Sequence, residues 1–336
     1  MTSLAELGCS TLGVWTREQA LQVMSRRVVA RLLQEGTWQT VFRGVHADGG
    51  YVLSPEQRAV AAVLASGGAG QPYPCGSQRQ DGPHAVRVRA VAGGRTAARI
   101  YGLPLVDDDD PATGGRDHLV DDVHVWSGLA DLETALRGRP VLRRHRSGLL
   151  PGSIGQTPSG AWLTSPLQTV VDCCLLLGPE AAVCVVDAAL QRRLVTLDDL
   201  AGKVRALTGR PGSRRVAGAF SLAAGRAEAP TETLARLLLL PVLPRLVPQV
   251  RLVGDDGRVL PVLDLADEAT RFAIETDGRR GHQGDAMVAK DQRRDLGSAH
   301  RGWWTERATW YDVRRRQAEL VRRVLWRHAW HTGRQR

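Results

Sequence analysis

The feature that most constrains the fold is an apolar strand that ends in two acids. The stretch FAIETDGRRGH runs from Phe272 to His282, and Glu275 and Asp277 follow its apolar start. Alternate side chains of a β-strand point to the same face, so these two carboxylates share one face. Like charges at that distance repel each other, and we therefore expect a positive group or a cation beside them.

The residues around this strand predict a compact α/β unit. The stretch VLPVLDLADEATRFAIETDG is typical of a β-hairpin whose first strand carries Asp264 and whose second carries both acids. An amphipathic helix, APTETLARLLLLPVL, precedes it and has Glu232 in its first turn. A helix over about 285–300, a short strand GWWTERAT and an arginine-rich helix from about Tyr311 follow. The predicted order is α-β-β-β-α-β-α.

These acids form a pattern suited to phosphodiester hydrolysis. Carboxylate oxygens bind Mg²⁺ (or Mn²⁺), which keeps several waters and takes its remaining ligands from phosphate. The metal acidifies an attacking water and offsets charge on the phosphate. The alternative is a hairpin that carries surface acids with no chemical role, and both readings stay open on the residues alone.

The positive charge is concentrated near the C-terminal end. The chain of 336 residues has a formal charge of +10, and only Lys203 and Lys290 of its 45 basic residues are lysines. Over 279–336, 14 arginines and one lysine face six acids, a net charge of +9. A polyanion is the natural partner for such a segment, and nucleic acid is the commonest one. Arginines that only solvate helix faces are the alternative.

Composition excludes several classes of protein. No apolar run reaches the 18 residues of a membrane span, and the N-terminus lacks the pattern of a signal peptide, so we expect a cytoplasmic protein with no membrane partner. The five cysteines contain no C-x-x-C pair, which predicts buried reduced thiols instead of disulfides or a zinc site.

The N-terminal fifty residues predict two short helices and a hairpin. Thr16 and Ser25 occupy N-cap positions, the second helix stops before Gly36, and a hairpin follows around Gly44. Helix, turn, helix and hairpin is the order of a winged helix-turn-helix, although a plain packing unit has the same order. The arginines expected to contact DNA from this unit are Arg26, Arg27, Arg31 and Arg43.

The middle of the chain predicts a mixed region. Short strands and loops extend from about 55 to 160, helices follow, and the stretch TGRPGSRR is interpreted as a hinge at their end. The fold class is therefore multidomain mixed α/β: a winged helix-turn-helix over 1–50, a central α+β and helical region over 51–225, and a restriction-endonuclease-like α/β domain over 226–336.

Five blocks of the last domain resemble a known family. PTETLAR, VLDLAD, AIETDGRRGH, KDQRRDL and GWWTERATWYDV are similar, in this order, to the very-short-patch-repair-like endonuclease domains of the PD-(D/E)xK superfamily. The N-terminal stretch VWTREQALQVMSRRVVARLLQEGTWQTVFRGV is similar to the winged-helix domain of AbiEi-type antitoxins. The resemblance covers about 226–330 for the endonuclease domain.

The resemblance implies roles for particular residues. Asp264 and Glu275 would be metal ligands, and the implied catalytic residues are Glu232, Asp264, Glu275, Asp277 and His282. Asp277 stands where the superfamily usually has a lysine, so the group that positions the water would be His282, Arg279 or Lys290. The predicted phosphate contacts of this domain are Arg279, Arg293 and Arg294.

Together these features predict a DNA-binding protein with a Mg²⁺-dependent endonuclease-like domain, acting in DNA repair or phage defence. The alternative is an antitoxin-like or transcriptional DNA binder whose nuclease-like domain is inactive, with a cognate toxin protein as a candidate partner.

Overall fold

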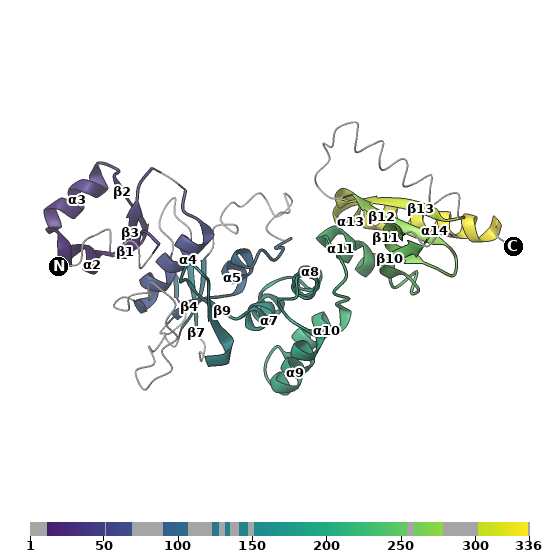
Figure 1. Ribbon diagram of the computed structural model, residues 1–336, viewed down its shortest axis with the longest axis horizontal. Coiled ribbons are helices and arrows are strands. Elements are labelled where there is room, and N and C mark those ends of the chain that lie inside the picture. Colours follow the sequence, from purple (N-terminus) through teal and green to yellow (C-terminus); the bar gives the residue numbers. More distant parts are fainter. Residues whose placement is uncertain are drawn as a thin grey trace. The chain divides into compact units, whose positions relative to one another are not determined.

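The computed structural model has a mixed α/β architecture with several sheets (Figure 1). It describes residues 12–50, 52–68, 90–106, 123–127, 132–134, 141–146, 151–253, 259–277 and 302–334. The chain divides into two compact units, Met1–Gly178 and Pro179–Arg336. The predicted three-part division stays a prediction.

The first unit begins with two capped helices and a small sheet. Thr16 forms a capping box with Gln19, and the hydroxyl of Ser25 accepts a hydrogen bond from the amide of Val28, so both predicted N-caps are confirmed. The sheet has the order β1-β3-β2, and the predicted hairpin turns at Gly44, whose φ is 75°. The elements are β1 (Val14–Thr16), α2 (Arg17–Val23), α3 (Arg26–Gln34), β2 (Trp38–Phe42) and β3 (Val45–Asp48).

A second sheet completes this unit, in the order β6-β7-β5-β4-β9-β8. Its core strands pack against α4, since buried residues of β4, β5 and α4 belong to one hydrophobic cluster. Helices α5 and α7 also pack against each other. The elements are α4 (Pro55–Val63), β4 (Ala90–Ala92), α5 (Gly94–Ile100), β5 (Val123–Ser127), β6 (Leu132–Thr134), β7 (Leu142–Arg146), β8 (Ile154–Gln156), β9 (Trp162–Thr164) and α7 (Pro166–Leu176).

The second unit starts with helices. The elements are α8 (Pro179–Gln191), α9 (Leu197–Leu207), α10 (Ser213–Leu222) and α11 (Pro230–Leu239). The interpretation of TGRPGSRR as the end of the helical stretch was wrong, because α10 begins at Ser213. Gly212 has a φ of 81° and turns the chain directly into this helix. The local glycine and proline signal marked a tight turn between helices.

A four-stranded sheet follows α11, with the order β10-β11-β12-β13 (Figure 1). The predicted hairpin is confirmed, since β11 pairs antiparallel with β12, while β12 and β13 are parallel. Phe272 of β12 contacts the rings of His328 and His331 on α14, which therefore covers that face of the sheet. The elements are β10 (Val247–Val253), β11 (Val259–Asp267), β12 (Phe272–Asp277), β13 (Trp304–Thr309), α13 (Trp310–Arg315) and α14 (Gln317–Arg334).

A buried carboxylate anchors α11 to α8. Asp187 of α8 is 1% exposed, and its Oδ1 accepts hydrogen bonds from the backbone N–H groups of Ala224 and Gly225 at 2.6 and 2.8 Å. Its Oδ2 accepts from the hydroxyl of Thr233 at 2.8 Å and from the guanidinium of Arg236 at 3.1 Å. Both of these partners lie on α11. A fully satisfied buried charge of this kind fixes the position of the first turns of α11.

Several predicted features lie outside the described residues: the helix over 285–300, His282, Lys290, Arg279, Arg293 and Arg294. In the described ranges, every helix is too short or too polar to cross a lipid bilayer.

Substitution of Asp187 tests the anchor. Asp187→Ala removes the acceptor of two amides and a hydroxyl, and leaves the buried guanidinium of Arg236 with the carbonyl of Leu222 but without its counter-charge. We therefore expect the free energy of unfolding of the second unit to fall by about 3–5 kcal/mol. The matched control is Asp198→Ala, which removes an exposed acid of α9 and should cost only a few tenths of a kcal/mol. Urea unfolding monitored by circular dichroism measures both values. Equal losses in the two variants would contradict the anchor.

Candidate functional site

The site is built around Glu232, in the first turn of α11. Pro230 occupies the start of the helix, where its missing N–H costs nothing. Glu232 is 5% exposed, and its Oε2 accepts hydrogen bonds from the backbone N–H of Glu228 at 3.1 Å and from Nε2 of Gln249 at 2.7 Å. The carboxyl group is therefore buried but oriented by two donors.

Gln249 reaches Glu232 from an unusual backbone conformation. Its φ is 56°, in the left-handed region that non-glycine residues seldom occupy within a strand. In the β10–β11 ladder it lies between the pairs Pro248–Leu265 and Val250–Leu263, and so is level with Asp264. Strained backbone of this kind persists only where surrounding contacts hold it. The hydrogen bond to Glu232 is one such contact.

Asp264 is held at the point where the β11–β12 ladder ends. The paired positions run from Asp267–Phe272 to Leu265–Ile274, and Asp264 comes next on β11. Its Oδ2 accepts hydrogen bonds from the backbone N–H and the hydroxyl of Thr276, at 2.8 and 2.9 Å. The Asp264 side chain thus occupies the place of a backbone acceptor and is fixed in orientation.

Glu232 and Asp264 are close enough to interact electrostatically. Burial and, to a smaller extent, the negative charge of Asp264 raise the pKa of Glu232 to about 7. The hydrogen bonds from Glu228 and Gln249 act in the opposite direction, because they stabilise the carboxylate form. Near neutral pH this group exchanges a proton readily, which is a property of groups that take part in acid–base chemistry or bind cations.

The two acids of the E-x-D pair lie beside an arginine of the neighbouring strand. In the parallel β12–β13 ladder Glu275 is level with Arg307. Nη1 of Arg307 lies 3.7 Å from Oδ1 of Asp277, and both side chains are about half exposed. A positive group therefore does accompany the pair, as the repulsion between the two acids led us to expect.

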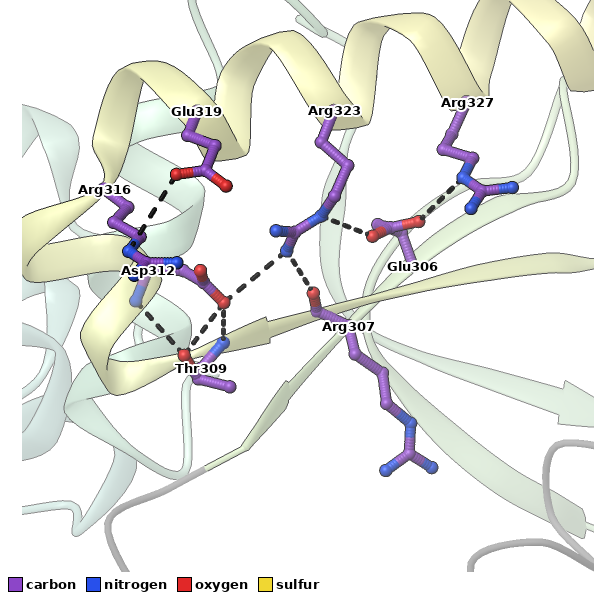
Figure 2. Close-up of polar contacts among 8 residues, drawn as sticks. All are labelled: Glu306, Arg307, Thr309, Asp312, Arg316, Glu319, Arg323 and Arg327. Carbon is purple, nitrogen blue, oxygen red and sulfur yellow. Dashed lines mark hydrogen bonds and ion pairs between the residues drawn. The ribbon is translucent and has the colours of Figure 1, made fainter.

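A network of polar contacts fixes β13 and with it Arg307 (Figure 2). Nε of Arg323 donates to Oε1 of Glu306 at 2.8 Å, and its Nη2 donates to the carbonyl of Arg307 at 2.8 Å. The same Nη2 lies 3.5 Å from Oδ2 of Asp312, which also accepts from the amide and hydroxyl of Thr309. One guanidinium on α14 thus joins β13 to α13.

The carboxylates of Glu232 and Asp264 could supply two of the ligands of a Mg²⁺ ion. Among residues that the structure describes, no three His, Cys, Asp or Glu side chains are arranged to hold a metal ion together. Mg²⁺ does not require such a cage, because it is commonly bound by one or two carboxylates together with waters and substrate phosphates. Glu232 and Asp264 fit this lower requirement, since a cation near them would relieve the like-charge effect that raises the pKa of Glu232.

The structure brings together only some of the predicted residues. Glu232 and Asp264 adjoin each other, and Glu275 and Asp277 share the ladder with β13. In the first unit the four predicted arginines, Arg26, Arg27, Arg31 and Arg43, are all exposed. The sequence analysis missed Gln249 and Arg307. A polar amide within the apolar stretch VPQVRLV was an available signal for Gln249, whereas Arg307 reaches the site only through a parallel pairing across a long segment.

Comparison with known proteins identifies relatives in Mycobacterium tuberculosis. No family model matches the chain. Two relatives, "Uncharacterized protein MT2308" of strain CDC 1551 / Oshkosh and "Uncharacterized protein Rv2248" of strain ATCC 25618 / H37Rv, are each 30% identical to it over 200 residues. The matched region is 57% of this chain and 71% of each relative.

Substitution of Gln249 tests whether its strained backbone serves Glu232. Gln249→Gly and Gln249→Ala both lose the donor to Glu232, so the pKa of Glu232 should rise above about 7 in both. Glycine tolerates the left-handed φ, and we expect the Gly variant to be more stable than the Ala variant by about 1 kcal/mol. Carboxyl ¹³C NMR titration and urea unfolding measure the two effects.

The control for Gln249 is Arg193→Gly. Arg193 is exposed and has a φ of 58°, so glycine should relieve backbone strain there without changing Glu232. A Gln249 variant that left the pKa of Glu232 unchanged, or lowered it, would contradict the role given to the amide.

The raised pKa of Glu232 also predicts a pH dependence of stability. The unfolded group titrates near pKa ~4.3, so between this value and about 7 the folded protein binds more protons than the unfolded one. Stability must then fall as pH rises through that window, by about 4 kcal/mol in total from this group. Glu232→Gln should remove the fall, as measured by urea unfolding from pH ~4 to ~8.

The matched control for this pH series is Glu268→Gln, which alters an exposed acid in the turn between β11 and β12. It should leave the pH dependence as in the native chain. If the native chain and Glu232→Gln gave parallel pH profiles, Glu232 would not have the proposed environment.

Proposed function

The chain belongs to the family of these two mycobacterial proteins, and we propose that it is a cytoplasmic DNA-binding protein whose second unit contains a Mg²⁺-dependent endonuclease-like domain. The observation that carries the proposal is the buried Glu232, with a pKa of about 7, next to the fixed carboxylate of Asp264. A restriction-endonuclease-like fold for the α11–β13 segment, akin to very-short-patch-repair-like domains, is part of the proposal, with DNA repair or phage defence as its setting.

The chain's own groups have separate tasks in the proposed reaction. Asp264, with Glu232 or Glu275, would hold Mg²⁺, which activates water and offsets charge on the phosphate. Gln249 keeps Glu232 oriented and partly ionised near neutral pH. Arg307, level with Glu275 on the adjacent strand, carries positive charge in the position where a phosphate or an attacking water needs it, although Asp277 replaces the usual lysine.

The first unit supports DNA binding through its exposed arginines. Ser25 caps α3, which presents Arg26, Arg27 and Arg31 to solvent, and Arg43 is exposed in the turn after β2. In the proposed winged helix-turn-helix, α3 would enter the major groove and Arg43 would reach a phosphate from the wing.

A second candidate function is DNA binding without hydrolysis, as in an antitoxin-like or transcriptional protein with a cognate toxin as partner. The ion pair between Asp277 and Arg307 favours it, because this pair engages the acid that replaces a lysine. The basic second unit would then act as a clamp, and its binding to DNA should weaken steeply with salt.

A nicking assay separates the two functions. The native chain should cleave plasmid, mismatched or single-stranded DNA when Mg²⁺ or Mn²⁺ is added. Glu275→Ala should reduce the cleavage rate to about one hundredth or less. Loss of a residue that only hydrogen-bonds to a metal ligand commonly lowers activity 10–100-fold, and loss of a ligand itself should lower it at least as much. The control is Glu268→Ala, an exposed acid that should leave the rate unchanged. Cleavage that is absent with every metal, or that survives Glu275→Ala, rules out the nuclease.

A further inference from the structure

Arginine and tryptophan side chains follow one side of α14 and include Arg316, the residue directly before it. Positions three, four and seven apart on a helix lie on the same side, so these residues line up along the helix axis. We name this set the Arg–Trp stripe; its members are Arg316, Arg323, Trp326, Arg327, Trp330 and Arg334.

Aromatic rings and guanidinium groups contact each other along the stripe. The guanidinium of Arg327 lies over the rings of Trp326 and Trp304, at 5.0 and 5.5 Å from their centroids. That of Arg334 lies over Trp330 at 3.9 Å, and the rings of Trp330 and Trp304 are 5.0 Å apart. Each cation is therefore already positioned next to an aromatic face, and little ordering is needed before a ligand binds.

The aromatic groups at the outer edge of this cluster are open to solvent. Trp326 is 60% exposed. Near the start of α14, Tyr311 is 55% exposed, with the guanidinium of Arg316 at 5.0 Å from its ring centroid. Large exposed aromatic side chains that bury little area contribute little to folding, which favours a role in binding.

The acids near the stripe orient its arginines without neutralising the surface. Glu306 pairs with Arg323 and Arg327 from β13 below, Asp312 also contacts Arg323, and Glu319 lies 3.9 Å from Arg316 (Figure 2). Over 304–334 eight arginines face these three acids, a net charge of +5. The surface is thus basic as well as aromatic.

We propose that the Arg–Trp stripe binds single-stranded DNA, with unpaired bases stacked on Trp326 and phosphates contacted by the neighbouring arginines. Every base has a face that stacks on an aromatic ring, and aromatic side chains within a basic surface are the common basis of single-strand binding. In a duplex these faces are covered by neighbouring base pairs. The inference deepens the proposed function, on which it rests, by naming DNA with unpaired bases as the substrate class.

The test is the affinity of the full chain for a fluorescein-labelled oligothymidine and for a duplex of the same length, by fluorescence anisotropy. EDTA is present throughout, so the measurement needs no cleavage. Native protein should bind the single strand, and Trp326→Ala should weaken this binding about fivefold or more. Duplex binding should change less than twofold, because phosphate contacts dominate it. Trp326→Phe should restore most of the single-strand affinity.

Leu325→Ala is the matched control, because Leu325 is a neighbouring exposed apolar residue, 38% exposed, outside the stripe. It should bind as the native chain does, and both Ala variants should keep the native melting temperature. Glu275→Ala should also keep single-strand affinity in EDTA. A native chain that binds the single strand but does not cleave it with Mg²⁺ or Mn²⁺ would refute the nuclease and retain the stripe. The stripe is refuted if native protein does not bind the single strand, or if Trp326→Ala leaves its affinity unchanged.

Discussion

The geometry of the second unit depends on one buried carboxylate. Asp187 is fully enclosed, and it accepts hydrogen bonds from the turn before α11 and from α11 itself. Gly225 in that turn has a φ of 65°, and a Cβ there would lie 2.9 Å from Leu190. Helix α11 therefore cannot shift along α8 without breaking several hydrogen bonds at once. Its first turn, and Glu232 within it, has a fixed position relative to α8.

The position of α11 also places two acids, Glu232 and Asp264, unfavourably close to each other. Glu232 is buried near Asp264, and two acids in a low dielectric oppose each other's ionisation. Gln249 and Thr276 partly compensate, since they donate hydrogen bonds to the two carboxylates. The left-handed backbone of Gln249 adds strain at the same place. Two neighbouring acids and a strained residue stabilise the fold less than apolar side chains would at the same positions. We therefore interpret the region around Glu232, Asp264 and Gln249 as a functional site.

The sequence predicted those features that depend on neighbouring residues. Thr16 and Ser25 were recognised as helix caps because capping involves residues only three positions apart. The hairpin with Asp264 and Glu275 followed from alternation and a short turn. Helix α10 was missed because its glycine- and proline-rich start gives the same signal as a linker.

Features that depend on distant residues could not be predicted. Arg307 meets Asp277 through the parallel pairing of β12 with β13. Gln249 combines a left-handed φ with a hydrogen bond to Glu232 on α11, a residue distant in the sequence. The burial that raises the pKa of Glu232 likewise arises from the packing of α11 on the sheet. The spacing of the acids in the sequence suggested a site. The raised pKa of Glu232 could not be predicted, because it depends on the tertiary arrangement.

Proton release on Mg²⁺ binding is the most direct test of the site as a cation-binding centre. Isothermal titration calorimetry at pH ~7 in two buffers with different ionisation enthalpies measures it. Because the pKa of Glu232 is about 7 without metal, binding should release about half a proton from the native chain and almost none from Glu232→Gln. No detectable Mg²⁺ binding, or equal proton release from both proteins, would contradict the account.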